Sequence, residues 1–121
     1  FCPLYQGLLT DKYINGTPSS SRAAKTIGLI RDGDLSESVI LCIKELNKIA
    51  SDRSQTLAQM ALSWVLRDDK ITSALIGASS AKQVIENTKC VENLNFSSEE
   101  KVLINEALSK ISLPKSLWAS E

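Results

Sequence analysis

A short, nearly apolar run at residues 71–76, rich in β-branched side chains, constrains the fold of this chain most. The run ends at Gly77, as expected for a parallel strand that is buried on both faces. Residues 1–3 suit the last residues of another strand, because the apolar stretch stops at Pro3. Two parallel strands leave unpaired edges and an open core, so independent stability is doubtful and an incomplete fold is expected.

Four segments have helical periodicity, and a capping residue precedes each of them. Two of these residues begin a capping box, in which a hydroxyl side chain is followed three positions later by Gln or Glu. The expected helices are about 36–51 after Ser36, from Thr56 to about Arg67, about 81–92 after Ser80, and a fourth after Ser97. The third has Val84, Ile85 and Val91 as apolar positions, and the fourth has a wide stripe of Val102, Leu103, Ile104, Ala107, Leu108 and Ile111.

Charge and histidine content exclude several classes of function. The 14 basic and 14 acidic residues give a formal net charge of zero, so no excess positive charge drives adhesion to nucleic acid or to an anionic membrane. The chain has no histidine, so it cannot by itself build a Ser-His-Asp site, a Cys-His site or a His-ligated metal. We expect no metal site and no nucleic-acid partner.

The cysteines and the apolar stretches bear on the cellular compartment of the protein. Cys2, Cys42 and Cys90 match neither a zinc pattern nor a disulfide framework, which favours reduced, mostly buried thiols in the cytoplasm. The longest uncharged stretches fall well short of the ~20 apolar residues of a membrane helix, so no membrane insertion is expected. The chain begins at Phe1 without a signal-peptide pattern, which favours a piece of a larger protein.

A stretch with little periodicity, residues 4–35, is rich in glycine and serine. Loops of this length are usually either functional or disordered. Lys12 and Arg22 lie within it, and cations on a glycine-punctuated loop can close over an anionic ligand. Solvated surface cations are the alternative interpretation.

The passage from residues 71–76 into the third helix is the most informative local feature. Small residues such as Gly77 and Ser79 let a ligand approach the backbone, and the first amides of the following helix favour phosphate. Gln83, Glu86 and Asn87 fall at i, i+3 and i+4, so they share one face and can form hydrogen bonds with a heterocycle. A solvated polar face is the alternative, and the local pattern alone favours it.

Four stretches, read together, carry a family resemblance: residues 1–13 (FCPLYQGLLTDKY), 21–23 (SRA), 61–67 (ALSWVLR) and 75–80 (LIGASS). With the polar face of the third helix, they resemble the carboxyl-terminal part of the aldo-keto reductase family, in the branch of bacterial glyceraldehyde-phosphate reductases and potassium-channel β-subunits. The resemblance covers residues 1–112. It implies an α/β fold, a (β/α)8 TIM barrel, to which residues 1–121 contribute one partial domain with the end of strand 7, strand 8 and about four helices.

The resemblance also implies NADP(H) as the cofactor. Its matching positions are Pro3, Leu4, Gly7 and Leu9 over the pyrophosphate, Lys12 and Arg22 near the phosphates, Gly77, Ser79 and Gln83 around the adenosine phosphate, and Glu86 and Asn87 at the adenine. Asp11 stands where a glycine usually precedes the lysine, and it could pair with Lys12 and weaken the phosphate contact. The family's catalytic Tyr, Lys, Asp and His belong to the part of the barrel before these residues, so no catalytic residue is expected in this chain.

Three functions stay open. The first is the NADP(H)-binding C-terminal fragment of an aldo-keto reductase that reduces aldehydes and ketones by hydride transfer, the fragment itself being inactive. The second is a regulatory module that binds NADPH and resembles a potassium-channel β-subunit. The third is an autonomous small helical interaction protein. We expect a cytoplasmic protein whose full-length form acts on a small carbonyl substrate, and self-association into a homo-oligomer stays open.

Overall fold

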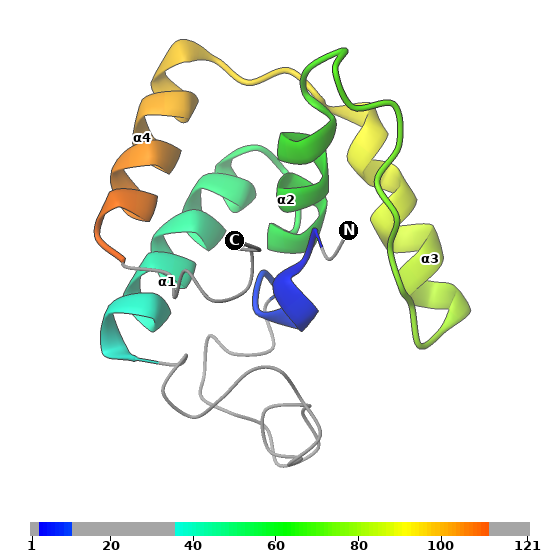
Figure 1. Ribbon diagram of the computed structural model, residues 1–121, viewed down its shortest axis with the longest axis horizontal. Helices are drawn as coiled ribbons and strands as arrows, with labels where there is room; N and C mark the ends of the chain where they lie inside the picture. The colour runs from blue at the N-terminus through cyan, green and yellow to red at the C-terminus, as the bar shows by residue number, and fades with distance from the viewer. Residues whose placement is uncertain (1–2, 11–35, 112–121) are drawn as a thin grey trace, which may run out of the picture.

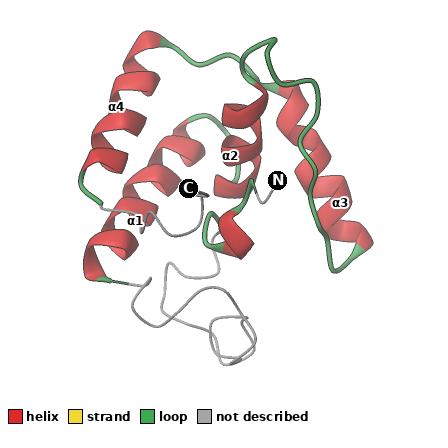
Figure 2. Cartoon of the chain, in the orientation of Figure 1, coloured by secondary structure: helices red, strands yellow, loops and turns green. Residues whose placement is uncertain are grey.

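The computed structural model describes residues 3–10 and 36–111 (Figure 1). All regular structure in these residues is helical, and Figure 2 shows no strand among them. None of the helices in this part of the chain is long and apolar enough to cross a membrane. The elements are η1 (Tyr5–Gly7), α1 (Glu37–Asp52), α2 (Leu57–Leu66), α3 (Ala81–Thr88), η4 (Lys89–Glu92) and α4 (Ser98–Ser109), where η denotes a 3₁₀-helix.

Helix α2 lies at the centre of the arrangement. Helix α1 packs against both α2 and α4, and α2 also contacts α3 and η4. The α-helices therefore follow the spatial order α4, α1, α2, α3 from left to right in Figure 1. The apolar core contains Leu8, Val39, Cys42, Ile43, Leu46, Ala50, Leu57, Met60, Phe96, Ile104 and Ala107.

Side-chain caps fix the start of every described α-helix at its predicted position, because each capping oxygen accepts a hydrogen bond from an otherwise unpaired N–H group. In the second and fourth helices, Gln59 or Glu100 completes a capping box. The predicted helix limits are confirmed to within one residue for the first two, and the predicted third helix is formed by α3 and then η4. The capping residues are Ser36, Thr56, Ser80 and Ser97.

The predicted strand over residues 71–76 does not form in the described part of the chain, so this prediction was wrong here. Ile71 is 45% exposed and Leu75 is 78% exposed, whereas the strand was expected to be buried on both faces. A parallel strand is held by hydrogen bonds to its neighbours, and the described residues supply no neighbouring strand. Of the other predicted strand end, residues 1–3, only Pro3 is described, and it lies in a turn.

Helices α3 and α4 bury less apolar surface than their patterns predict. No residue of α3 is buried, and on α4 only Ile104 and Ala107 are buried. Periodicity shows which side chains are apolar, but burial also needs a partner to cover them. The predicted apolar positions that are exposed are Val84, Ile85, Val91, Val102 and Leu103.

A buried arginine joins the end of α1 to the segment before α4. The Arg53 guanidinium donates hydrogen bonds to the carbonyl oxygens of Asn93 and Asn95, at 3.1 and 2.9 Å, and to Glu100 Oε2 at 2.6 Å. It also lies 3.8 Å from the centre of the Phe96 ring. Since Glu100 also completes the capping box of α4, one carboxylate both caps α4 and neutralises a buried cation.

Candidate functional site

The predicted phosphate-binding segment leads directly into α3. Residues 77–80 are exposed, and a Cβ atom added at Gly77 would meet no heavy atom within 4 Å beyond its chain neighbours. The backbone there is therefore open to a ligand. Ser80 caps α3, and the first N–H groups of a helix point outward at the positive end of its dipole. An anion is therefore favoured at this end of α3.

The first turn of α3 brings Ser79 and Gln83 together. Gln83 Oε1 accepts hydrogen bonds from the Ser79 backbone N–H at 2.8 Å and from the Ser79 hydroxyl at 3.0 Å. The Gln83 amide nitrogen donates to no residue in the described part of the chain. These two predicted site residues form one polar cluster, in which the Gln83 amide nitrogen is available to donate to an anion.

Glu86 and Asn87 follow one turn later on α3, on the same side of the helix as Gln83. Asn87 is half-buried, whereas Glu86 is exposed and lies 3.7 Å from Lys82 Nζ. An exposed ion pair of this kind contributes little, so the Glu86 carboxylate can accept a hydrogen bond from a ligand. The Glu86 backbone carbonyl is held separately, because it accepts a hydrogen bond from Gln59 Nε2 at 2.7 Å.

The predicted pyrophosphate loop is described over its first residues only. Pro3, Leu4, Gly7 and Leu9 are half-buried in and around η1. The Leu4 carbonyl accepts hydrogen bonds from the N–H groups of Gly7 and Leu9, at 2.9 and 3.2 Å. Gly7 has a φ of +94°, a left-handed conformation that residues with a Cβ rarely adopt. This turn therefore requires glycine at position 7.

The described residues do not join the two groups of predicted positions into one site. Figure 1 shows η1 below α2, and α3 to the right of α2. Lys12 and Arg22, the cations predicted to meet the cofactor phosphates, lie outside the described residues. The part of the predicted site that the structure assembles is the polar side of α3 with the segment before it.

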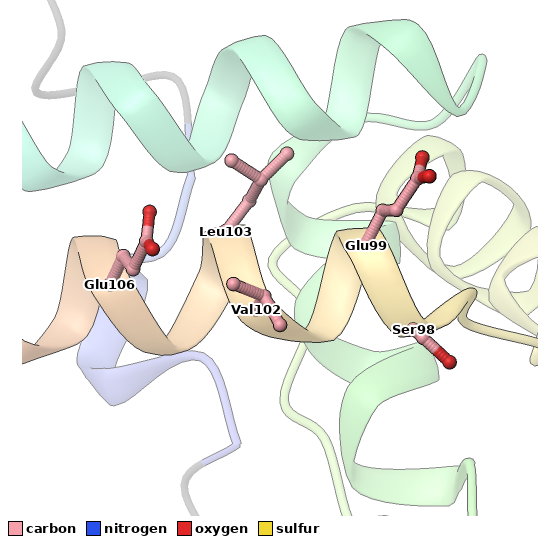
Figure 3. A pocket seen from close by; sticks show the side chains of 5 residues that line it. All are labelled: Ser98, Glu99, Val102, Leu103 and Glu106. Atoms are coloured by element: carbon pink, nitrogen blue, oxygen red, sulfur yellow. The ribbon is translucent and has the colours of Figure 1, made fainter.

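A shallow hollow of about 380 Å³ lies on α4 and contains none of the predicted site residues (Figure 3). All of its lining side chains come from this one helix, whereas ligand sites usually combine polar groups from several elements. No group of three metal-ligating side chains comes together within residues 3–10 and 36–111. The hollow is lined by Ser98, Glu99, Val102, Leu103 and Glu106.

Two cysteines are free and buried, Cys42 and Cys90. Burial raises the pKa of both thiols, and the Glu45 carboxylate raises the pKa of Cys42 further although Lys110 lowers it. Thiols with a raised pKa are poor nucleophiles at neutral pH. The expectation of unpaired, buried cysteines is confirmed for these two, and Cys2 lies outside the described residues.

The family model described as "Aldo/keto reductase family" matches residues 1–109, which is most of the chain. The chain belongs to the aldo/keto reductase family. This confirms the family resemblance of the separated stretches, including the branch. The relatives that show the branch are an L-glyceraldehyde 3-phosphate reductase and a potassium channel β-subunit.

This aldo/keto reductase chain is 44% identical over 121 residues to L-glyceraldehyde 3-phosphate reductase of Escherichia coli strain K12, a match that covers 98% of the chain and 34% of that relative. The protein of the same name from Escherichia coli O157:H7 is 43% identical over 121 residues, with the same shares covered. A Schizosaccharomyces pombe protein named as a voltage-gated potassium channel subunit beta is 34% identical over 94 residues, which is 74% of the chain and 27% of that relative. The chain thus spans about a third of the length of the curated Escherichia coli relatives it matches.

Sequence reasoning missed the residues on α2 whose side chains contact α3 and η4. Gln59 was identified only as the last residue of a capping box, and Ser63 only as part of a motif. The capping box does signal that Gln59 Oε1 faces the backbone N–H of Thr56. Nothing local signals that its amide nitrogen reaches Glu86, because residue 86 lies 27 positions away in the sequence.

Proposed function

We propose that this chain is the NADP(H)-binding, carboxyl-terminal part of an aldo-keto reductase that reduces a small aldehyde or ketone by hydride transfer. One observation carries the proposal. In a chain of this family, the open segment at Gly77 leads into a capped α3 that presents Ser79, Gln83, Glu86 and Asn87 along one polar side.

The chemistry of these groups suits the adenosine end of a dinucleotide. Donors from Ser79, Gln83 and the first amides of α3 favour the 2′-phosphate, and charge-assisted hydrogen bonds to a phosphate are short and strong. Glu86 can accept from the adenine amino group, and Asn87 can both donate and accept. On this proposal, Lys12 and Arg22 add positive charge from the loop after η1. Pro3, Leu4, Gly7 and Leu9 form the start of that loop over the pyrophosphate.

The proposal gives residues 1–121 the role of one partial domain of a (β/α)8 barrel, with the end of strand 7, strand 8 and the helices that follow them. Residues 71–76 form no strand in the described chain, and on this proposal they become strand 8 only beside the strands of the rest of the barrel. Bound NADPH supplies the hydride. This chain binds and orients the cofactor, and the groups that protonate the carbonyl oxygen come from the rest of the barrel. The free, buried thiols of Cys42 and Cys90 suit a reducing compartment such as the cytoplasm.

Cofactor choice tests the proposal. We expect NADPH to bind more tightly than NADH, because Arg22, Lys12 and Ser79 favour the additional 2′-phosphate. The variant Arg22→Ala should lose roughly 1.5–3 kcal/mol of NADPH affinity, about ten- to a hundredfold, and little NADH affinity. The matched variant Glu86→Ala should weaken both cofactors about equally, because adenine is common to the two. Calorimetric titration measures all four affinities.

Two results would contradict this assignment. An equal loss of NADPH and NADH affinity in Arg22→Ala would remove the phosphate role of Arg22. Failure of the full-length protein that carries this chain to bind either cofactor would remove the proposal as a whole.

The relative named as a potassium channel β-subunit favours a second candidate, an NADPH-binding regulatory subunit of a membrane channel. The two functions share the residues on α3 and differ in turnover. The protein that carries this chain in the cell should oxidise NADPH with small aldehydes under the first function. Under the second, it should bind NADPH and co-purify with a channel, with slow or no turnover.

A further inference from the structure

We infer that Gln59 and Ser63 are positioning residues that set the register of α3 on α2, and thereby place Glu86 and Asn87 for the adenine. The inference deepens the proposed function and rests on it for the identity of the ligand. Neither residue lies on α3, and both belong to α2.

Two hydrogen bonds, which we call rungs, join α2 to α3 and η4, and they lie one helical turn apart. Gln59 Nε2 donates to the Glu86 carbonyl oxygen at 2.7 Å, and the Ser63 hydroxyl lies 2.8 Å from the Cys90 carbonyl oxygen. Positions 59 and 63 are four positions apart in the sequence, as are positions 86 and 90, so the rungs match in spacing. Two rungs fix both the sliding and the rotation of α3 and η4 against α2.

Both side chains are held before they reach α3. Gln59 Oε1 accepts from the Thr56 backbone N–H at 2.9 Å, so the amide plane of Gln59 is fixed and its nitrogen faces away from the cap. Ser63 is fully buried, accepts from Gln55 Nε2 at 2.9 Å, and shares its single proton between the carbonyls of Gln59 and Cys90. Because their orientations are already fixed, these donors lose little conformational entropy when they bind the carbonyls of α3 and η4.

Apolar packing contributes to this register at Cys90 of η4, which is buried, but little along α3. No residue of α3 is buried, and Val84 and Ile85 on α3 are exposed. An apolar contact also tolerates sliding, whereas a hydrogen bond is lost when its donor moves away by about an ångström. The position of Glu86 therefore depends on the Gln59 contact to its own carbonyl group.

The test uses the full chain and two measurements, hydrogen–deuterium exchange of the α3 amides and calorimetric titration with NADPH. Gln59→Glu keeps an oxygen for the Thr56 cap but presents an acceptor to the Glu86 carbonyl, so it removes this hydrogen bond and adds a charge at a buried position. We expect α3 to exchange about tenfold faster and NADPH to bind about tenfold more weakly. Ser63→Ala removes the second rung with little change in volume, and we expect about threefold effects in the same direction.

Ser97→Ala is the matched control, because it removes the cap of α4 and leaves both rungs intact. It should lower global stability. The exchange rate of the α3 amides relative to the other helices, and the NADPH affinity, should both stay unchanged. In a Glu86→Ala background, Gln59→Glu should weaken NADPH binding by less than about threefold, because the contact that it positions is already gone. A purely structural role of Gln59 would give the same factor in both backgrounds.

The outcomes separate the two proposals. Wild-type exchange rates of the α3 amides in both Gln59→Glu and Ser63→Ala would overturn the positioning role, whatever the NADPH affinity of these variants. Faster α3 exchange in a chain that never binds NADPH would support the register and reject the proposed function. Faster exchange with unchanged NADPH affinity would overturn the link between α3 register and cofactor binding. If Gln59→Glu does not fold, Ser63→Ala decides between these results.

Discussion

Arg53 donates more long-range hydrogen bonds than any other residue in the described part of the chain. Its guanidinium links α1 to two carbonyl groups of the segment before α4 and to Glu100, and it covers one face of Phe96. Phe96 also packs against Trp64 of α2 in an edge-to-face arrangement, with the ring centres 5.0 Å apart. A single charged side chain thus connects three helices around an aromatic pair.

Replacing this arginine should be costly. Arg53→Met keeps much of the side-chain volume but leaves Glu100 and two carbonyl groups without their donor, so we expect a loss of about 2–4 kcal/mol in the free energy of unfolding. Arg67→Met is the matched control, because Arg67 also lies over an aromatic ring, that of Trp64, but is exposed. It should lose less than about 1 kcal/mol. Urea denaturation measures both, and equal losses would refute a special role for Arg53.

The carboxylate partner of Arg53 predicts a dependence of stability on pH. Burial acts to raise the pKa of Glu100, but hydrogen bonds from the Ser97 backbone and from Arg53, with the charge of Arg53, outweigh burial and lower the pKa. A pKa lowered by folding adds stability above the unfolded-state value, and this stability is lost as pH falls through the folded-state value. The unfolding free energy of the wild type should therefore fall on acidification below about pH 4.5.

The variant Glu100→Gln isolates this effect. It should be less stable than the wild type at pH 7 and should lose less stability on acidification, so that the two curves approach each other at low pH. Urea denaturation at a series of pH values gives both curves. Parallel curves throughout the acidic range would show that Glu100 does not carry the effect.

At the scale of elements, the end of α1 contains a strained residue. The N–H of Gln55 donates to the Ala50 carbonyl and the N–H of Ser54 donates to the Ser51 carbonyl, both at 2.9 Å, which is a Schellman motif. The position after the C-cap in this motif is left-handed and is usually glycine. Here it is Ser54, with a φ of +56°.

Ser54→Gly should therefore stabilise the chain. Relief of the left-handed strain outweighs the greater freedom of glycine in the unfolded state, and we expect a gain of about 0.5–1 kcal/mol. Ser51→Gly is the matched control within α1, where glycine should destabilise by a similar amount. Thermal unfolding followed by circular dichroism compares them, and a lower melting temperature for Ser54→Gly would contradict the assignment of strain.

The elements also show what could be predicted from the sequence. Helix starts were predictable because a cap is made within four residues, as at Ser36 and Ser97. The absence of a strand at residues 71–76 could not be predicted from the local sequence. A strand forms only beside another strand, and β-branched residues alone do not supply that neighbour. The Ser79–Gln83 cluster follows from spacing along one helix, whereas the Gln59 contact to Glu86 joins residues too far apart for any local pattern to show.

At the scale of the whole molecule, apolar side chains are exposed on the segment and helix that carry the site. Ile71 and Leu75 precede α3, and Val84 and Ile85 lie on it. In the proposed barrel, these side chains contact strands and helices that correspond to the other two thirds of the relatives' length, outside the matched region. On the same proposal, the polar side of α3 and the segment before it face the cofactor.

Mapping NADP⁺ onto the chain by amide-resolved NMR tests the central claim most directly. Titration of the labelled chain should shift the amide signals of Gly77, Ser79, Gln83, Glu86 and Asn87, together with those of residues 4–12 and of Arg22. Signals of Val102 and Leu103 in the α4 hollow, which contains none of the proposed site residues, should stay unchanged and serve as the internal control. Shifts confined to α4, or no saturable shifts on α3, would contradict the claim that this part of the chain binds the cofactor.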